Sequence, residues 1–171
     1  MNKNIAKTNI AKLVKKYQQT LEANKIRGYN EAQTRNEFIE PLFEFLGWDM
    51  RNLNHSSEVI TEENVSKGRV DLAFQLNSIP VMFLEAKSMK VDLDDWKWAQ
   101  QAINYSWNKG VSWAVLTDFE GIKVFNAEVP PKDLYQNLFF ELKWSEYTDK
   151  FDQLWMLSKT SFEENIIDEQ A

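Results

Sequence analysis

Cysteine is absent from this chain of 171 residues, and the sequence holds only one histidine. The absence of cysteine excludes disulfides, thiolate catalysis and zinc sites built on cysteine. The single histidine, His55, cannot build a histidine-rich metal site, and we assign it no role. A reducing cytoplasm is compatible with this composition, and we expect a cytoplasmic protein.

Long apolar runs are also missing. No stretch of about 18 apolar residues occurs, so we expect no membrane-spanning segment and no membrane partner. The N-terminus, Met-Asn-Lys-Asn-Ile-Ala-Lys-Thr, lacks the apolar run of a signal peptide. The composition, 43% hydrophobic and 27% charged, suits one globular domain with a substantial core.

Positive charge is in deficit, and it is unevenly distributed. The net charge of −6 argues against a stand-alone nucleic-acid binder. Residues 1–30 nevertheless carry seven Lys and Arg against Glu22 alone, and the rest of the chain is strongly acidic. The lysines of this segment are interpreted either as a solvated helix face or as contacts to a phosphate backbone.

The stretch from Gly68 to Lys87 is the most informative part of the sequence. Two apolar, strand-like runs flank a short polar turn that we expect to end at Pro80. An antiparallel hairpin turning about Ser78 pairs residues whose numbers sum to about 156, which places Asp71 opposite Glu85. Lys87 shares the face of Glu85, because side chains two apart in a strand point the same way.

Three charges converging on one patch of a hairpin have two interpretations. Two carboxylates repel each other unless a cation bridges them, and hard oxygen ligands suit Mg²⁺. A nearby ammonium can polarise a water or stabilise a developing anion. The alternative is a structural salt-bridge cluster on a half-exposed hairpin.

Hydrophobic periodicity and turn residues predict one domain, with Asn30 as a helix N-cap and Gly47 as a helix stop. We expect a single domain over residues 1–160 with its core over about 30–144, followed by an acidic linker over residues 161–171. The helices are expected over residues 4–24, 31–46, 94–108 and 145–158. The strands are expected over residues 58–61, 68–76, 81–87, 111–117, 121–125 and 138–144.

Two helices carry further candidate residues. Glu31 falls on the buried stripe of its helix, so it is either a charge at the helix N-terminus or an inward-facing functional group. Gln101 and Tyr105 lie one turn apart on the face that also carries Trp98. That face is either a packing surface with a buried tyrosine or part of a site.

The order α-β-β-β-α-β, with the strand Asp71, the motif Glu85-Ala86-Lys87 and the motif Gln101-x-x-x-Tyr105, resembles the PD-(D/E)xK nuclease superfamily. One departure is Val70, where the superfamily name has Pro. A narrower resemblance covers most of the chain. It rests on Glu31-x-x-Thr34-Arg35-x-x-Phe38, Leu46-Gly47-Trp48, Gly68-Arg69-Val70-Asp71 and Trp113 to Asp118, in that order. The chain is similar to the N-terminal nuclease domain of type I restriction R subunits and of single-chain type IIG or type ISP restriction–modification enzymes.

The resemblance implies an α/β fold with a mixed sheet flanked by helices and Mg²⁺-dependent hydrolysis of DNA, with Mn²⁺ as a possible substitute. It implies metal ligation by Asp71, Glu85 and the Ala86 carbonyl, and a catalytic Lys87. Gln101, Tyr105 and Glu31 are expected to line the site, and Lys67 and Arg69 are candidates for contact with DNA phosphate.

The resemblance also implies partners that this sequence lacks. No glycine-rich methyl-donor loop, N-P-P-Y-type motif or ATP-binding G-x-x-x-x-G-K-[ST] loop occurs. The family would place the methyltransferase, its S-adenosylmethionine site and the target-recognition domain beyond residue 171. A double-strand cut would need two copies meeting on double-stranded DNA.

Two other functions stay open at this stage. One is a related nuclease of DNA repair or mobile-element defence, as distinct from phage defence by restriction. The other is an inactive nucleic-acid-binding domain of the same fold, against which the intact Asp71, Glu85 and Lys87 argue.

Overall fold

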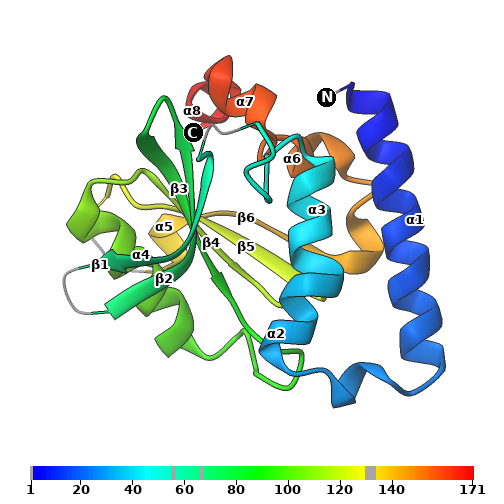
Figure 1. Cartoon of the computed structure of the whole chain (residues 1–171). Coiled ribbons are helices and arrows are strands. Elements are labelled where there is room, and N and C mark those ends of the chain that lie inside the picture. The colour runs from blue at the N-terminus through cyan, green and yellow to red at the C-terminus, as the bar shows by residue number, and fades with distance from the viewer. Residues whose placement is uncertain (1, 55–56, 66–67, 130–133) are drawn as a thin grey trace.

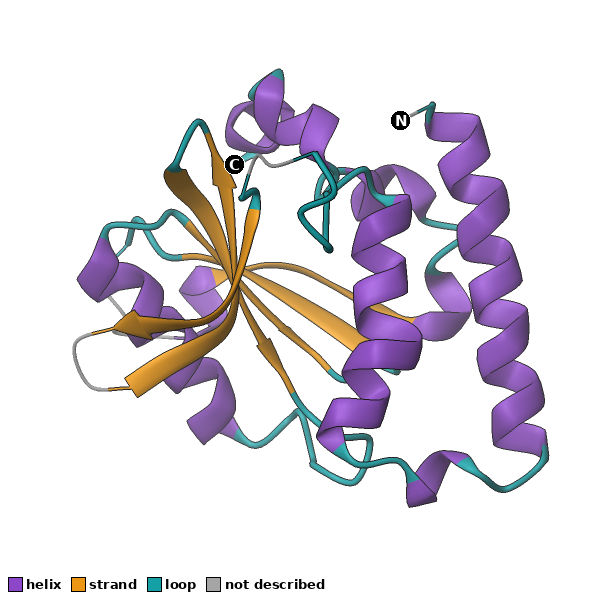
Figure 2. Ribbon diagram, viewed as in Figure 1, coloured by secondary structure: helices purple, strands orange, loops and turns teal. Residues whose placement is uncertain are grey.

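The computed structural model describes residues 2–54, 57–65, 68–129 and 134–171. A six-stranded sheet forms the centre, and its strands are hydrogen-bonded in sequence order. They are β1 (Val59–Val65), β2 (Gly68–Leu76), β3 (Ile79–Ala86), β4 (Trp113–Thr117), β5 (Gly121–Asn126) and β6 (Leu138–Lys143). Only the β3–β4 pair is parallel. The sheet is therefore mixed, as predicted, and it twists into the fan that Figure 2 shows.

Helices cover both faces of the sheet (Figure 1). One side carries α1 (Lys3–Glu22), η1 (Ile26–Gly28), α2 (Glu31–Thr34), the π-helix η2 (Arg35–Ile39) and α3 (Glu40–Phe45). The other carries α4 (Trp96–Lys109) and the short α5 (Leu134–Asn137). Because α4 connects the parallel strands β3 and β4, it crosses the sheet beside the end of β3, where the predicted site residues lie.

The larger core fills the space between the sheet and α1 with α3. Ile10, Tyr17 and Phe38 are fully buried there, and Phe38 packs on Phe119 with ring centroids 5.1 Å apart. Asn2 caps α1 by accepting hydrogen bonds from the N–H groups of its first turn. The lysines of α1 lie on its exposed face, as the periodicity predicted.

The expected helix over residues 31–46 is interrupted. Pro41 has no N–H to donate to the Glu37 carbonyl, and the turn before it widens into the π-helix η2. The Lys16 ammonium lies 3.3 Å from that Glu37 carbonyl oxygen and so supplies a donor in its place. Gly47 ends the helical stretch with φ of 100°, which confirms its assignment as a helix stop.

The C-terminal prediction is wrong in two respects. Residues 145–158 do not form one helix, because η3 (Trp144–Glu146) and turns separate β6 from α6 (Phe151–Trp155). Residues 161–171 are not a linker. They belong to α7 (Lys159–Glu163) and α8 (Ile166–Gln170), which bury Phe162 and Ile167 against the domain.

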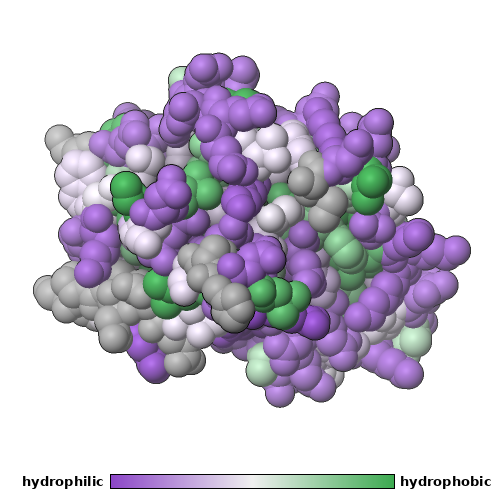
Figure 3. Space-filling model, turned by 45° about the horizontal axis from the view of Figure 1, so that its top comes forward, coloured by the Kyte–Doolittle hydropathy of each residue, from purple (hydrophilic) through white to green (hydrophobic). Residues whose placement is uncertain are grey.

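The surface is mainly hydrophilic on the face drawn in Figure 3, with hydrophobic residues scattered in small patches. Among the described residues, no helix has the length and apolar character needed to cross a bilayer.

Candidate active site

The hairpin of β2 and β3 brings Asp71 and Glu85 together. Leu72 pairs with Leu84 and Ala73 with Phe83, so the predicted sum of 156 holds at the end of the hairpin that carries the charges. The turn itself differs, because Asn77 and Ser78 take positive φ and Pro80 already pairs with Gln75 inside β3. Our expectation that the turn ends at Pro80 is wrong, and a bulge between Phe74 and Gln75 absorbs the difference.

The two carboxyl groups are hydrogen-bonded to each other, and the Asp71 Oδ2 atom also accepts from the Ala86 N–H at 2.7 Å. Glu85 is 5% exposed, and its Oε1 atom is buried without a hydrogen-bond partner. Burial raises the pKa of Glu85 well above its usual range, and the charge of Asp71 raises it further, whereas Lys87 lowers it.

The residues present fit a divalent metal with hard oxygen ligands. The unpartnered Glu85 oxygen and the adjacent Asp71 carboxylate supply two such ligands, and the Ala86 backbone lies beside them. Within the described ranges, no three Asp, Glu or His side chains come close enough to hold an ion between them. Mg²⁺ keeps several of its water ligands in proteins. Two carboxylates are therefore enough to bind it when water and substrate phosphate fill the other coordination positions.

Lys87 reaches the same position from the end of β3. Its backbone N–H donates to the Thr117 carbonyl oxygen at 2.9 Å, which anchors the residue to β4. Its ammonium lies 4.0 Å from the centroid of the Trp98 ring, in a cation–π contact. The helical spacing predicts Trp98 on the face that carries Gln101 and Tyr105, but it predicts no role for the ring. The only signal was its position one turn before Gln101.

Glu31 faces this cluster from the opposite helical layer. The helix cap is made by Asn30 and Gln33, which form a capping box, so Glu31 does not serve as the cap. Its pKa is raised by burial and by Asp71, and is lowered by Lys87 and Arg35. Glu31 thus interacts electrostatically with Asp71 and Lys87, and it also supplies the negative charge in the first turn of α2.

Gln101 and Tyr105 lie together on α4, one and two turns after Trp98. The Gln101 amide donates to the Tyr105 hydroxyl at 2.8 Å, and Tyr105 is half-buried against β2. A Cβ atom built on Gly68 would lie 2.4 Å from the Tyr105 hydroxyl oxygen. Glycine at this position therefore allows the tyrosine to approach the strand. Arg69 is exposed in β2 next to this contact, whereas Lys67 lies outside the described residues.

We predict that Gly68→Ala lowers the activity of the site about tenfold by displacing Tyr105, with little change in folding stability, because only a side-chain end must move. Tyr105→Phe removes the clashing oxygen, so adding Gly68→Ala to Tyr105→Phe should cost much less than it costs the wild type. A double-mutant cycle of turnover measures this coupling. Independent, additive effects would contradict the proposed contact.

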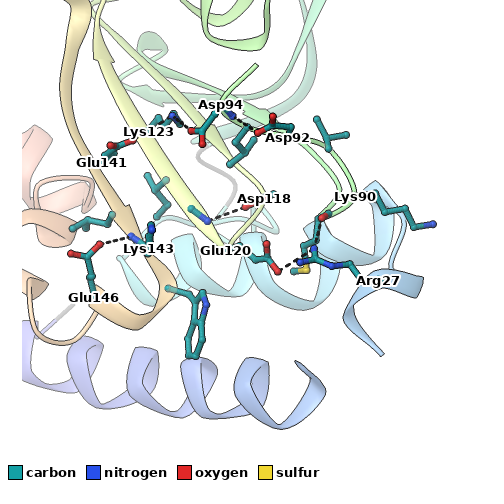
Figure 4. Close-up of a pocket in the computed structure, with 17 residues that line it drawn as sticks. Arg27, Lys90, Asp92, Asp94, Asp118, Glu120, Lys123, Glu141, Lys143 and Glu146 are labelled. Atoms are coloured by element: carbon teal, nitrogen blue, oxygen red, sulfur yellow. Dashed lines mark hydrogen bonds and ion pairs between the residues drawn. The ribbon is translucent and has the colours of Figure 1, made fainter. Parts of the chain in front are cut away.

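A second concave region of about 720 Å³ lies at the ends of β4, β5 and β6 (Figure 4). Its charged side chains largely neutralise each other. Arg27 lies 3.3 Å from Glu120, and Lys123 lies 2.6 Å from Asp94 and 3.3 Å from Glu141. Asp118, at its inner end, is 3% exposed and accepts from the Gly121 N–H at 2.9 Å.

Burial raises the pKa of Asp118 from 3.8 to about 7, and the charge of Glu120 adds to this rise. Between about pH 4 and pH 7 the Asp118 carboxyl stays protonated in the folded protein but is ionised in the unfolded chain. The free energy of unfolding therefore falls as pH rises through this range. We predict that Asp118→Asn, which keeps an acceptor for Gly121, is stabilised relative to wild type by up to about 4 kcal/mol above pH 7. Chemical denaturation of both proteins across pH measures the difference. A gap that does not widen between pH 4 and pH 7 would contradict it.

Comparisons with known proteins identify the family of this chain. A protein-family model described as "Type I restriction enzyme R protein N terminus" matches residues 30–138. The chain is 30% identical over 168 residues to the type II restriction enzyme and methyltransferase RM.Eco57I of Escherichia coli, covering 90% of this chain and 16% of that protein. It thus spans about one sixth of the length of this relative.

Two solved structures match the chain at low identity, and the first of them shares its fold. The type IIG restriction endonuclease BpuSI matches with a TM-score of 0.51 and 21% identity, over 80% of this chain and 17% of that one. A fragment of a putative HsdR subunit of a type I restriction enzyme from Vibrio vulnificus YJ016 matches with a TM-score of 0.49 and 22% identity, over 58% of this chain and 21% of that one.

Proposed function

The chain belongs to the family of the type I restriction enzyme R protein N terminus, and from that premise we propose that it is a Mg²⁺-dependent nuclease module that hydrolyses DNA phosphodiester bonds. The observation that carries the proposal is the pairing of the half-buried Asp71 with the buried Glu85, which has one carboxylate oxygen without a hydrogen-bond partner and interacts electrostatically with Lys87. A salt-bridge cluster would leave no such atom unpaired in the protein interior. The pair therefore fits a binding site better than a structural ion network.

Mg²⁺ held by Asp71 and Glu85, with the Ala86 carbonyl as a further ligand, would supply a water of lowered pKa and a positive charge against the phosphate oxygens. Lys87 orients the attacking water and stabilises the charge that develops on the pentavalent phosphate. The water oxygen loses a proton to solvent as it forms a bond to phosphorus, one bridging P–O bond breaks, and the leaving sugar oxygen takes up a proton from solvent. Gln101 and Tyr105 position the phosphate, and Glu31 orients Lys87 by its charge.

The relative that matches most of this chain combines restriction and methyltransferase activity by name, and this chain spans only 16% of its length. We therefore propose that the module acts within a type IIG-like restriction–modification enzyme. The methyltransferase with its S-adenosylmethionine site, and target recognition, would belong to other parts of that enzyme. Two copies would meet on DNA for double-strand cleavage.

Plasmid cleavage tests the function. With Mg²⁺ or Mn²⁺, the 171-residue chain should nick supercoiled DNA slowly and without sequence preference, because the net charge of −6 repels DNA and recognition surface is scarce. EDTA should stop the reaction, and full-length protein should cut faster and at defined sites. A folded full-length protein that leaves DNA intact with either metal would favour an inactive nucleic-acid-binding domain instead.

We predict that Trp98→Leu slows Mg²⁺-dependent cleavage about tenfold to a hundredfold, because the Lys87 ammonium loses the ring that holds it at 4.0 Å. Trp98→Phe, which keeps an aromatic face, should recover most of the rate. Metal affinity, measured by calorimetry, should be unchanged in both variants, since Trp98 offers no ligand. Equal rates for the Leu and Phe variants would show that packing, and not the cation–π contact, sets the position of Lys87.

A further inference from the structure

Helix α4 differs in charge from the rest of the molecule. The chain contains 26 Asp and Glu residues, yet none of them lies within Trp96–Lys109, whose only charged residues are Lys97 and Lys109. One side of the helix packs on the sheet through Ala99, Ala102 and Ile103. The other side is therefore the surface of a strongly acidic protein from which carboxylates are missing.

This outer side forms a shallow depression of about 460 Å³, which we call the amide face. It is lined by Lys97, Gln100, Gln101, Asn104, Tyr105 and Asn108. Residues 97, 100, 104 and 108 are spaced three or four apart, as are 97, 101, 105 and 108, so the side chains form two neighbouring rows along the helix axis. Among the described residues, no hydrogen bond engages the side-chain amides of Gln100, Asn104 or Asn108, which leaves their donors and acceptors available.

The amide face is continuous with the candidate active site. Gln101 and Tyr105, two of the residues predicted to line the site, are hydrogen-bonded at 2.8 Å and also line this face. At the other end, the Trp98 ring carries the Lys87 ammonium at 4.0 Å and the Lys97 ammonium at 4.7 Å. A ligand bound at Lys87 that extends beyond one phosphate would therefore run onto this face.

We propose that the amide face of α4 contacts the sugar–phosphate backbone of DNA next to the phosphate being cleaved. The inference rests on the proposed nuclease function and names the surface along which its substrate lies. Asn, Gln, Tyr and Lys side chains are common donors to phosphate oxygens and fix the register of a protein on DNA. A row of amides also lets a polyanion approach an acidic chain without meeting a carboxylate.

The two kinds of donor on this face differ in a measurable way. A lysine that neutralises a phosphate releases counterions, so it contributes to the salt dependence of binding, whereas a neutral amide adds affinity without that contribution. Lys97→Ala should therefore reduce the slope of log affinity against log salt by about one. Replacing Asn104 and Asn108 by Ala should weaken binding about threefold and leave the slope unchanged.

Binding of a short labelled duplex by the 171-residue chain, measured by anisotropy in EDTA between about 50 and 200 mM salt, tests the proposal. The double variant Asn104→Asp and Asn108→Asp keeps side-chain shape but adds two negative charges, and should raise Kd at least about tenfold. Gln153→Glu, at an exposed position of α6, is the control for an added negative charge elsewhere on the surface and should bind as wild type. A photo-crosslinking residue at position 104 should join to DNA under ultraviolet light, and the same residue at 153 should not.

The outcomes separate the two proposals. Wild-type affinity in the Asp double variant, together with no crosslink from position 104, would overturn the amide face even if the wild-type chain cleaves DNA. If the Asp substitutions and the crosslink behave as expected but the wild type does not cleave with Mg²⁺, the surface stands and the proposed nuclease function fails.

Discussion

Asp71→Asn, Glu85→Gln and Lys87→Met are each expected to reduce Mg²⁺-dependent cleavage by at least about 10³-fold, because each removes a charge that the reaction uses. The two carboxylate variants should also lose divalent metal affinity in calorimetry, whereas Lys87→Met should retain it. This division follows from the geometry, in which Asp71 and Glu85 form the oxygen pair and Lys87 rests on Trp98. All three variants are therefore expected to lose activity, but only the two carboxylate variants are expected to lose metal affinity as well.

The three variants should remain folded. Glu85→Gln keeps the shape of a side chain that burial already favours in its neutral form, and Asp71→Asn keeps an oxygen for the Ala86 N–H. Thermal unfolding within a few degrees of wild type, or higher for Glu85→Gln, is the expected control. Wild-type cleavage by any of the three would contradict the assignment of the site.

The position of this site was predictable because its determinants are local. The pairing of Asp71 with Glu85 follows from a hairpin whose two runs are adjacent in sequence, and the observed register keeps the predicted sum of 156 at Leu72 and Leu84. The turn was placed two residues too long, yet the bulge after Phe74 restores the register. Such compensation is visible only when both strands are aligned in space.

Contacts between distant segments were harder to predict. Nothing in the spacing of residues 31–46 shows that Lys16, on another helix, supplies a donor to the carbonyl that Pro41 leaves without a backbone partner. The Lys87–Trp98 contact depends on how α4 crosses the sheet, which periodicity does not fix. The periodicity predicts that Glu31 lies on the buried stripe of its helix, but it does not predict which residues of other elements surround it.

The C-terminal residues show the same limit. Glu163, Glu164, Asp168 and Glu169 make the sequence look solvated, and we expected a linker. Ser158 instead caps α7, the Trp113 indole donates to Asp168 at 2.8 Å, and the Lys159 N–H donates to the Leu46 carbonyl at 3.0 Å. A few long-range contacts outweigh the polar composition of a short segment.

Trp48→Ala is expected to destabilise the domain by about 3–5 kcal/mol, because Trp48 is 1% exposed and its removal leaves a large cavity. Its ring packs on Phe74 of β2 and Phe162 of α7, with centroids 5.0 and 5.8 Å away. Its indole N–H donates to the Leu157 carbonyl oxygen at 2.9 Å. The side chain thus joins the end of α3, the sheet and the C-terminal helices.

Thermal and denaturant unfolding measure the effect, and a fall in Tm of about 10 °C or more is expected for a domain of this size. Trp48→Phe keeps most of the apolar contact but leaves the Leu157 oxygen without its donor, so it should cost only about 1–2 kcal/mol. The difference between the two variants separates packing from hydrogen bonding. If Trp48→Ala unfolds within a degree of wild type, the C-terminal helices do not contribute to the core, and the original expectation of a linker would be the better description of residues 161–171.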